Sequence, residues 1–237
     1  MQIIPVFDLK EGILVHAVGG MRQNYQPLQT PLLPGPEPEK ACATLVRLGF
    51  RRFYIADLDA ITKSGNNFDL VRKLVRDYPI QVWLDAGLAG PEEIPLQDVS
   101  QVSLVAGSET LAGLCCLPDI CRQIGASRLV FSLDTKNGEV LTPDPALKGV
   151  DPVDLAAEVL AHGIREMIVL DLRAVGSRAG LNKGLLDKLT RRISGARFFP
   201  GGGLTPEDIT GLKRMNIPGV LTATALYSQQ IAALPEL

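Results

Sequence analysis

The chain has 237 residues, of which 46% are hydrophobic and 21% charged, so it can bury a core and has the length of one α/β barrel. Its net charge of −2 gives no general attraction for nucleic acid, and no apolar run reaches the roughly 18 residues of a membrane span. Its four cysteines show no paired metal-ligand spacing, which is typical of reduced core thiols in a cytoplasmic protein.

Short apolar runs recur along the chain. They are apolar throughout where a half-exposed strand would alternate, as is typical of parallel strands that are buried on both faces. Segments with helical spacing lie between them, at 39–48, 68–78 and 154–161, and strand and helix are expected to alternate eight times. The predicted strands are residues 3–7, 52–56, 80–84, 102–106, 128–133, 167–170, 197–200 and 219–222.

Two connections stand out in this order. Residues 9–36 are too long for a plain strand-to-helix loop, which predicts a lid or binding segment, with a disordered flap as the alternative. Thr205 precedes Pro206, Glu207 and Asp208, so a helix is expected to begin there with Thr205 as its N-cap.

The second half of the chain repeats the first. Asp8, Lys10 and Gly12 follow one apolar run, and Asp134, Lys136 and Gly138 follow another with the same spacing. Residues 51–60 match 165–174, residues 85–94 match 201–209, and residues 102–111 match 220–227 more weakly. We therefore predict one domain over residues 1–237, a (β/α)₈ TIM barrel of the α/β class built from two (β/α)₄ halves at about 1–120 and 121–237.

The carboxyl ends of the predicted strands gather acidic residues, and in such barrels this face carries the chemistry. Asp8 and Asp134 occupy equivalent places on the first and fifth strands, so we predict that they face each other as a general acid and a general base. The alternative is that each carboxylate caps a loop. The other acids at strand ends, which either contact substrate or hold loops, are Asp57, Asp85 and Asp171.

A phosphate site is expected at the ends of the seventh and eighth strands, where a glycine run meets a helix start. Its predicted residues are Gly202, Gly203, Ala223 and Thr224. The repeat implies a partner site at Gly87, Gly107 and Ser108, which would suit a substrate with a phosphate at each end. The first half has lost part of this glycine run, because Asp85 and Ala86 stand where the second half has glycines.

These segments resemble the HisA/HisF family of histidine-pathway phosphosugar barrels, over essentially the whole chain. The likeness is carried by IIPVFDLKEGILV at 3–15, LVFSLDTKNGEV at 129–140, PGGGLTPEDI at 200–209 and TATALY at 222–227, with ADLDA at 56–60 closer to ProFAR isomerase than to the cyclase. The resemblance implies an Amadori aldose–ketose rearrangement of a phosphorylated ribosyl-amine. It implies Asp8 as general base at the sugar C2 and Asp134 as general acid at the ring oxygen.

The departures from that pattern fall on substrate contacts. The third strand ends in Asp85-Ala86-Gly87 and lacks the family's arginine, and the first and sixth loops differ, where Arg22 and Ser177 are possible substrate contacts. The segment VHAVGGMRQNYQPL at 15–28 is similar to a branch of methanogens and methylotrophs that is associated with one-carbon cofactor metabolism, involving tetrahydromethanopterin or methanofuran.

Two other functions stay open on the same barrel. One is a lyase or aldolase that acts through a Schiff base on Lys63 or Lys136, or through a metal held by Asp57, Asp59, Asp85 and Asp171. The other is a non-catalytic relative that binds a phosphorylated metabolite. The isomerase hypothesis needs neither metal nor organic cofactor, expects a phosphorylated small molecule as its partner, and leaves the oligomeric state open.

Overall fold

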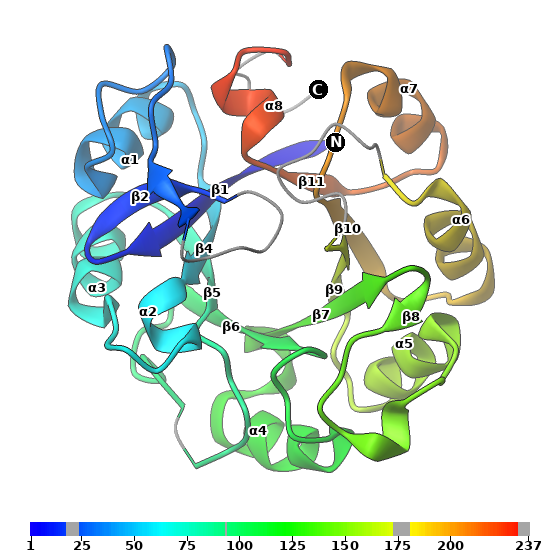
Figure 1. Ribbon diagram of the computed structural model, residues 1–237. Coiled ribbons are helices and arrows are strands. Elements are labelled where there is room, and N and C mark those ends of the chain that lie inside the picture. The colour runs from blue at the N-terminus through cyan, green and yellow to red at the C-terminus, as the bar shows by residue number, and fades with distance from the viewer. Residues whose placement is uncertain (18–23, 93, 173–180, 232–237) are drawn as a thin grey trace.

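A closed ring of parallel strands surrounded by helices forms the centre of the molecule (Figure 1). The computed structural model describes residues 1–17, 24–92, 94–172 and 181–231. Strand β11 pairs with β1 and closes the ring, so the predicted α/β class and TIM barrel are confirmed. In ring order the strands are β1 (Gln2–Lys10), β4 (Arg52–Asp57), β5 (Gln81–Asp85), β6 (Val102–Gly107), β7 (Leu129–Lys136), β9 (Glu166–Asp171), β10 (Arg197–Gly201) and β11 (Gly219–Thr222).

The helices lie outside the ring and cover its apolar outer face. The longest of those predicted from spacing appear as α1 (Pro38–Arg47), α3 (Phe68–Asp77) and α5 (Pro152–Ala161). The predicted start at Thr205 is confirmed, because the Asp208 carboxylate accepts hydrogen bonds from the Thr205 N–H and hydroxyl at 2.9 and 3.0 Å. The other helices are α2 (Leu58–Ile61), α4 (Leu117–Ile124), α6 (Lys183–Arg192), α7 (Pro206–Arg214) and α8 (Thr224–Tyr227), with 3₁₀ turns η2 (Leu114–Cys116), η3 (Ala126–Arg128) and η4 (Pro145–Leu147).

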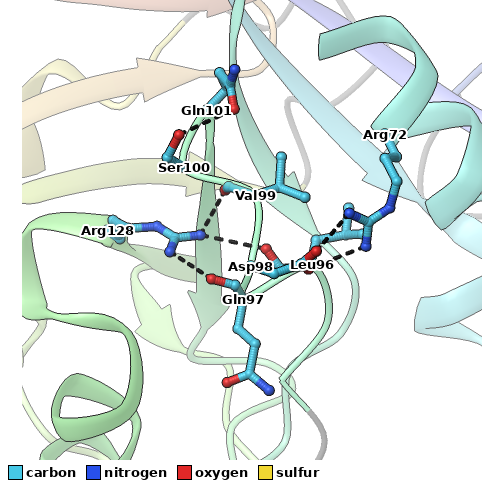
Figure 2. Close-up of polar contacts among 8 residues, drawn as sticks. All are labelled: Arg72, Leu96, Gln97, Asp98, Val99, Ser100, Gln101 and Arg128. Atoms are coloured by element: carbon cyan, nitrogen blue, oxygen red, sulfur yellow. Dashed lines mark hydrogen bonds and ion pairs between the residues drawn. The ribbon is translucent and has the colours of Figure 1, made fainter. Parts of the chain in front are cut away.

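The predicted alternation of strand and helix is wrong between β5 and β6, where the described residues of the connection form turns. Pro91 and Pro95 both lie in this short segment, and proline inside a helix removes a backbone hydrogen bond. The Arg128 guanidinium binds the segment instead, donating to the carbonyl oxygens of Gln97 at 2.7 Å and Val99 at 2.8 Å. Figure 2 shows Arg128 approaching the segment from one side and Arg72, paired with Asp98, from the other.

The interior of the ring is filled with side chains below its mouth. Trp83 and Phe199 pack edge to face with ring centroids 4.8 Å apart. Because side chains alternate between the two faces of a strand, the residue two or four positions further along returns to the interior. The packed layer consists of Ile4, Trp83, Val105, Val130, Ile168, Phe199 and Leu221. This spacing brings Asp8, Asp85 and Asp134 to the mouth of the barrel above that layer.

The long first connection is partly strand. After β1 the chain turns back as β2 (Ile13–His16), which pairs antiparallel with β1, and β3 (Gln26–Pro27) pairs with β2. The Leu14 N–H donates to the Pro36 carbonyl at 2.8 Å, and Leu28 and Leu33 are buried in the core. The disordered-flap alternative is therefore wrong for residues 9–17 and 24–36.

Two further expectations concern the cysteines and the membrane. Cys42 is buried, as predicted for a core thiol, but Cys115 is exposed because it lies in the short η2 turn at the surface. The core-thiol prediction is thus wrong for Cys115. Every helix among the described residues is too short or too polar to span a bilayer.

Candidate active site

The barrel opens at the carboxyl ends of its strands into a cavity of about 770 Å³. The cavity brings together residues from both halves of the sequence repeat. Of the site residues predicted from the sequence, those that line it are Asp8, Asp85, Gly107, Asp134, Gly202, Gly203, Ala223 and Thr224.

Asp8 and Asp134 lie on opposite sides of this mouth. In the ring, β7 is the fourth strand from β1 in either direction, so the two strands stand across the barrel from each other. Asp8 is half-buried, whereas Asp134 is only 5% exposed. The two carboxyl groups therefore share one cavity but differ in their access to water.

The surroundings of Asp134 favour its protonated form. Burial, together with the negative charges of Asp85 and Glu109, raises the pKa of Asp134 to about 7, although the hydrogen bond from Ser132 opposes this rise. The Ser132 hydroxyl donates to Oδ1 of Asp134 at 2.6 Å, and the Glu109 N–H donates to Oδ2 at 3.4 Å. Asp134 is thus a fixed carboxyl group that can donate a proton near neutral pH.

Asp85 is fixed on both of its oxygens. The Tyr54 hydroxyl donates to Oδ2 at 2.9 Å, and the Gly87 N–H donates to Oδ1 at 3.0 Å. Burial, followed by the charges of Asp85, Asp134 and Asp8, raises the pKa of Tyr54 well above its usual range. Tyr54 therefore stays a hydrogen-bond donor at every physiological pH.

Asp57 lies away from the cavity. Its side chain is fully buried and does not line the cavity. Its carboxylate accepts hydrogen bonds from the Ala60 N–H at 3.2 Å, the Asn67 N–H at 2.6 Å and the Asn67 amide at 2.8 Å. Asp57 holds the connection between β4 and α3, which is the loop-holding role that the sequence left open for it.

Asp59 and Asn67 connect the same loop to the turn between β1 and β2. The Glu11 N–H donates to Asp59 Oδ2 at 2.7 Å, and the Gly12 N–H donates to Asn67 Oδ1 at 3.0 Å. Two of the acids that the metal-assisted alternative requires are thus engaged in holding backbone. Among residues 1–17, 24–92, 94–172 and 181–231, no three His, Cys, Asp or Glu side chains gather in a metal-binding arrangement.

Two residues of the predicted partner phosphate site, Ser108 and Gly87, are engaged within the fold. Ser108 is 1% exposed, and its hydroxyl accepts a hydrogen bond from the Asp134 N–H at 3.0 Å. Gly87 does not line the cavity; its φ of 67° and its closeness to Ile61 require glycine, since an added Cβ would lie 2.9 Å from the Ile61 Cα. Gly107 does line the cavity, where an added Cβ would lie 3.0 Å from Asp134 Oδ2.

The opposite end of the cavity keeps its glycines. Gly202 and Gly203 have φ angles of 80° and 66°, a left-handed conformation that glycine adopts without strain. Next to them, β11 leads directly into α8 at Ala223 and Thr224, and the His16 ring lies 3.5 Å from the Thr224 hydroxyl.

Asp171 and two loop residues are the remaining predicted contacts. Asp171 is half-buried at the end of β9 and is not among the residues that line it. Arg22 and Ser177 lie outside the described residues.

Sequence reasoning missed the residues that position the acids. Tyr54 lines the cavity and holds Asp85, and Ser132 holds Asp134. Each is a polar group on an inward-facing position of a largely apolar strand. Ser132 lies two residues before Asp134 on the same face of β7, and Tyr54 lies on β4, the strand next to Asp85. Glu109 and Lys136 also line the cavity.

The chain is similar in sequence to known proteins over nearly its whole length. A family model described as "Histidine biosynthesis protein" matches residues 2–232. An uncharacterized protein of Methanocaldococcus jannaschii is 28% identical over 96% of this chain and 93% of its own length. A second protein of the same organism, named 1-(5-phosphoribosyl)-5-((5-phosphoribosylamino)methylideneamino) imidazole-4-carboxamide isomerase, is 25% identical over 96% of this chain and 94% of its own length. The isomerase of that name from Bacillus cytotoxicus is also 25% identical, over 97% and 94%.

Proposed function

The chain belongs to the histidine biosynthesis protein family, and from that premise we propose that it is an isomerase that converts a phosphorylated ribosyl-amine from its aldose to its ketose form. The observation that carries the proposal is the pair of unlike carboxyl groups across one cavity. Asp134 is buried with a pKa of about 7, and Asp8 faces it from the opposite strand with more access to water. Such a pair can act as general acid and general base on one substrate.

The chemistry requires only proton transfers. Protonated Asp134 donates its proton to the ring oxygen as the bond from C1 to that oxygen breaks, which leaves an iminium at C1. The Asp8 carboxylate then removes the proton from C2, and the electron pair neutralises the iminium nitrogen. The resulting enolamine becomes the ketose when the proton of its C2 hydroxyl is transferred to C1. Substrate and product have the same atoms, so no oxidant or other reactant is needed.

The phosphate of the substrate is assigned to the loops after β10 and β11. Gly203, Ala223 and Thr224 line the cavity there, and the backbone comes close to the cavity because the glycines carry no side chain. Among the described residues, no side chain accepts a hydrogen bond from the N–H groups of these three residues. This arrangement supports phosphate binding in the place where barrels of this class commonly have it.

A lyase or aldolase that uses a Schiff base is the second candidate. One observation favours it: Lys136, the last residue of β7 and two residues after Asp134, lines the cavity. Lys63 does not line it. Borohydride trapping with a phosphosugar distinguishes the two candidates, because only the Schiff base becomes covalently linked to Lys136.

The proposed isomerase is tested by turnover of phosphorylated ribosyl-amines with the wild type, Asp8→Asn and Asp134→Asn. Each variant is expected to lose activity by about 10²- to 10⁴-fold, the usual contribution of a general acid or base, while its circular dichroism stays unchanged. Asp98→Asn, which removes an exposed acid at the other end of the barrel, is the matched control. Unchanged turnover in both site variants would exclude the mechanism. The link to one-carbon cofactor metabolism and the cytoplasmic location stay predictions from the sequence.

A further inference from the structure

The two ends of the cavity are related by the sequence repeat but differ in charge. Asp85-Ala86-Gly87 at the end of β5 corresponds to Gly201-Gly202-Gly203 at the end of β10. At the β5–β6 end the cavity is lined by Asp85 and Glu109, with Asp134 beside them on β7. At the β10–β11 end the predicted phosphate-binding residues that line the cavity are uncharged. Asp8 on β1 lies beside the β10–β11 end as Asp134 on β7 lies beside the β5–β6 end, so the two ends differ by the carboxyl groups of Asp85 and Glu109.

Four backbone donors of the β5–β6 end are already engaged within the fold. The Gly87 N–H donates to Asp85 Oδ1 at 3.0 Å, and the Ser108 N–H donates to the Ser132 carbonyl at 2.8 Å. The Glu109 N–H donates to Asp134 Oδ2 at 3.4 Å, and the Thr110 N–H donates to the Gly107 carbonyl at 3.1 Å. A phosphate binds in such loops through backbone N–H groups, so these four are not open to it.

Asp85 is part of the fold and cannot move aside without losing contacts. Both of its oxygens are held, one by the Tyr54 hydroxyl and one by the Gly87 N–H. Asp85 lines the cavity and its Oδ1 accepts the Gly87 N–H, so the carboxylate stands between this donor and the cavity. An ionised carboxylate accepts hydrogen bonds and donates none, and it repels a phosphate that carries nearly two negative charges.

We propose that the substrate carries a single phosphate, bound at the β10–β11 end, and that Asp85 determines this specificity by excluding a second phosphate. The β5–β6 end then takes a hydrogen-bond donor of the substrate, an amino or hydroxyl group. This inference rests on the proposed function for the orientation of the substrate. It sets the chain apart from its relatives whose names contain two phosphoribosyl groups.

The experiment counts bound inorganic phosphate in crystals of the full chain and, by calorimetric titration, in solution. The wild type is expected to bind one phosphate per chain, beside Gly203 and Thr224. Asp85→Gly, which restores the residue found at the equivalent Gly201, is expected to gain a second phosphate beside Gly87 and Gly107. Asp85→Ala serves if the glycine variant does not fold, and Asp98→Asn is the matched control that removes an acid from the far end of the barrel.

A wild-type phosphate beside Gly87 and Gly107, or none beside Gly203, would overturn the proposal. So would a folded Asp85 variant that still binds one phosphate. These readouts do not depend on turnover. If the isomerase hypothesis is wrong, the wild type shows no turnover but still binds a single phosphate. If the present inference is wrong, an active wild-type enzyme binds two phosphates.

Discussion

The Ser132 hydroxyl donates a hydrogen bond to Oδ1 of Asp134 at 2.6 Å, from two residues earlier on the same strand. Because the bond favours the ionised carboxylate, it works against the burial that raises the Asp134 pKa to about 7. One strand thus supplies both the proposed acid and the group that limits its proton affinity.

Ser132→Ala is expected to raise the pKa of Asp134 further. In the proposed mechanism the enzyme is active while Asp134 holds its proton, so the alkaline fall in kcat is expected to move to higher pH. The pH dependence of kcat measures this shift. Ser100→Ala, in the loop bound by Arg128 at the opposite end of the barrel, is the control and should leave the profile in place. A profile unchanged in Ser132→Ala would show that Asp134 is not the titrating acid.

The raised pKa of Asp134 also predicts how the stability of the fold depends on pH. Its folded pKa of about 7 exceeds the unfolded value of about 3.9, so the folded state binds the proton more tightly. The free energy of unfolding of the wild type is therefore expected to fall as pH rises from about 4 to about 7. The contribution of Asp134 to this fall is up to the order of 4 kcal/mol, and above pH 7 it changes little.

Asp134→Asn removes this titration. The stability of the variant relative to the wild type is expected to be higher at pH 8 than at pH 4. The reason is that at pH 8 the wild type carries a buried charge that the variant lacks. Urea unfolding at a series of pH values gives the difference in unfolding free energy. If the unfolding free energies of variant and wild type differed by the same amount at pH 4 and pH 8, the raised pKa of Asp134 would be contradicted. Asp119→Asn, an exposed acid on α4, controls for the general effect of losing a carboxylate.

Much of the site was readable from the sequence because the repeat fixes which residues are equivalent. Asp8 and Asp134 each follow an apolar run on strands that the barrel sets opposite each other, and the two line one cavity. The hydrogen bonds that fix Asp57 and Ser108 were not readable, because they involve Asn67 and Ser132, which lie further along the chain. Strand ends indicate where side chains lie but not which of them the neighbouring loops engage.

The missing helix between β5 and β6 had a similar cause. The repeat predicted a helix there, but the proline spacing of this half differs, and Arg128 from the following connection satisfies the carbonyl groups of the turns. A hydrogen bond between residues some thirty positions apart leaves no periodic signal in the sequence. The two prolines were visible in the sequence, but the contacts of Arg128 that hold the turns were not.

Arg128→Ala is expected to destabilise the fold without changing the site. The side chain donates to the carbonyl groups of Gln97, Val99 and Val102 at 2.7 to 2.9 Å, and these acceptors would lose a charged donor. We expect a loss of about 2–4 kcal/mol, seen in urea unfolding, with kcat preserved. Arg128→Lys should rescue little, because lysine lacks the planar fork. The control is Arg122→Ala, whose pair with Asp119 is exposed and contributes little.

Gly107→Ala is expected to impair turnover more than folding. Its added Cβ would lie 3.0 Å from Asp134 Oδ2 and 3.4 Å from the Thr110 hydroxyl, so the proposed acid must shift to make room. A displaced acid is expected to lower kcat by about 10- to 100-fold, since small misplacements of catalytic groups are costly. Gly211→Ala in α7 meets no atom within 4 Å and should instead stabilise the helix by about 0.5–1 kcal/mol. Steady-state kinetics and urea unfolding of both variants make the comparison. Equal kcat in Gly107→Ala and the wild type would mean that the position of Asp134 does not matter for the reaction.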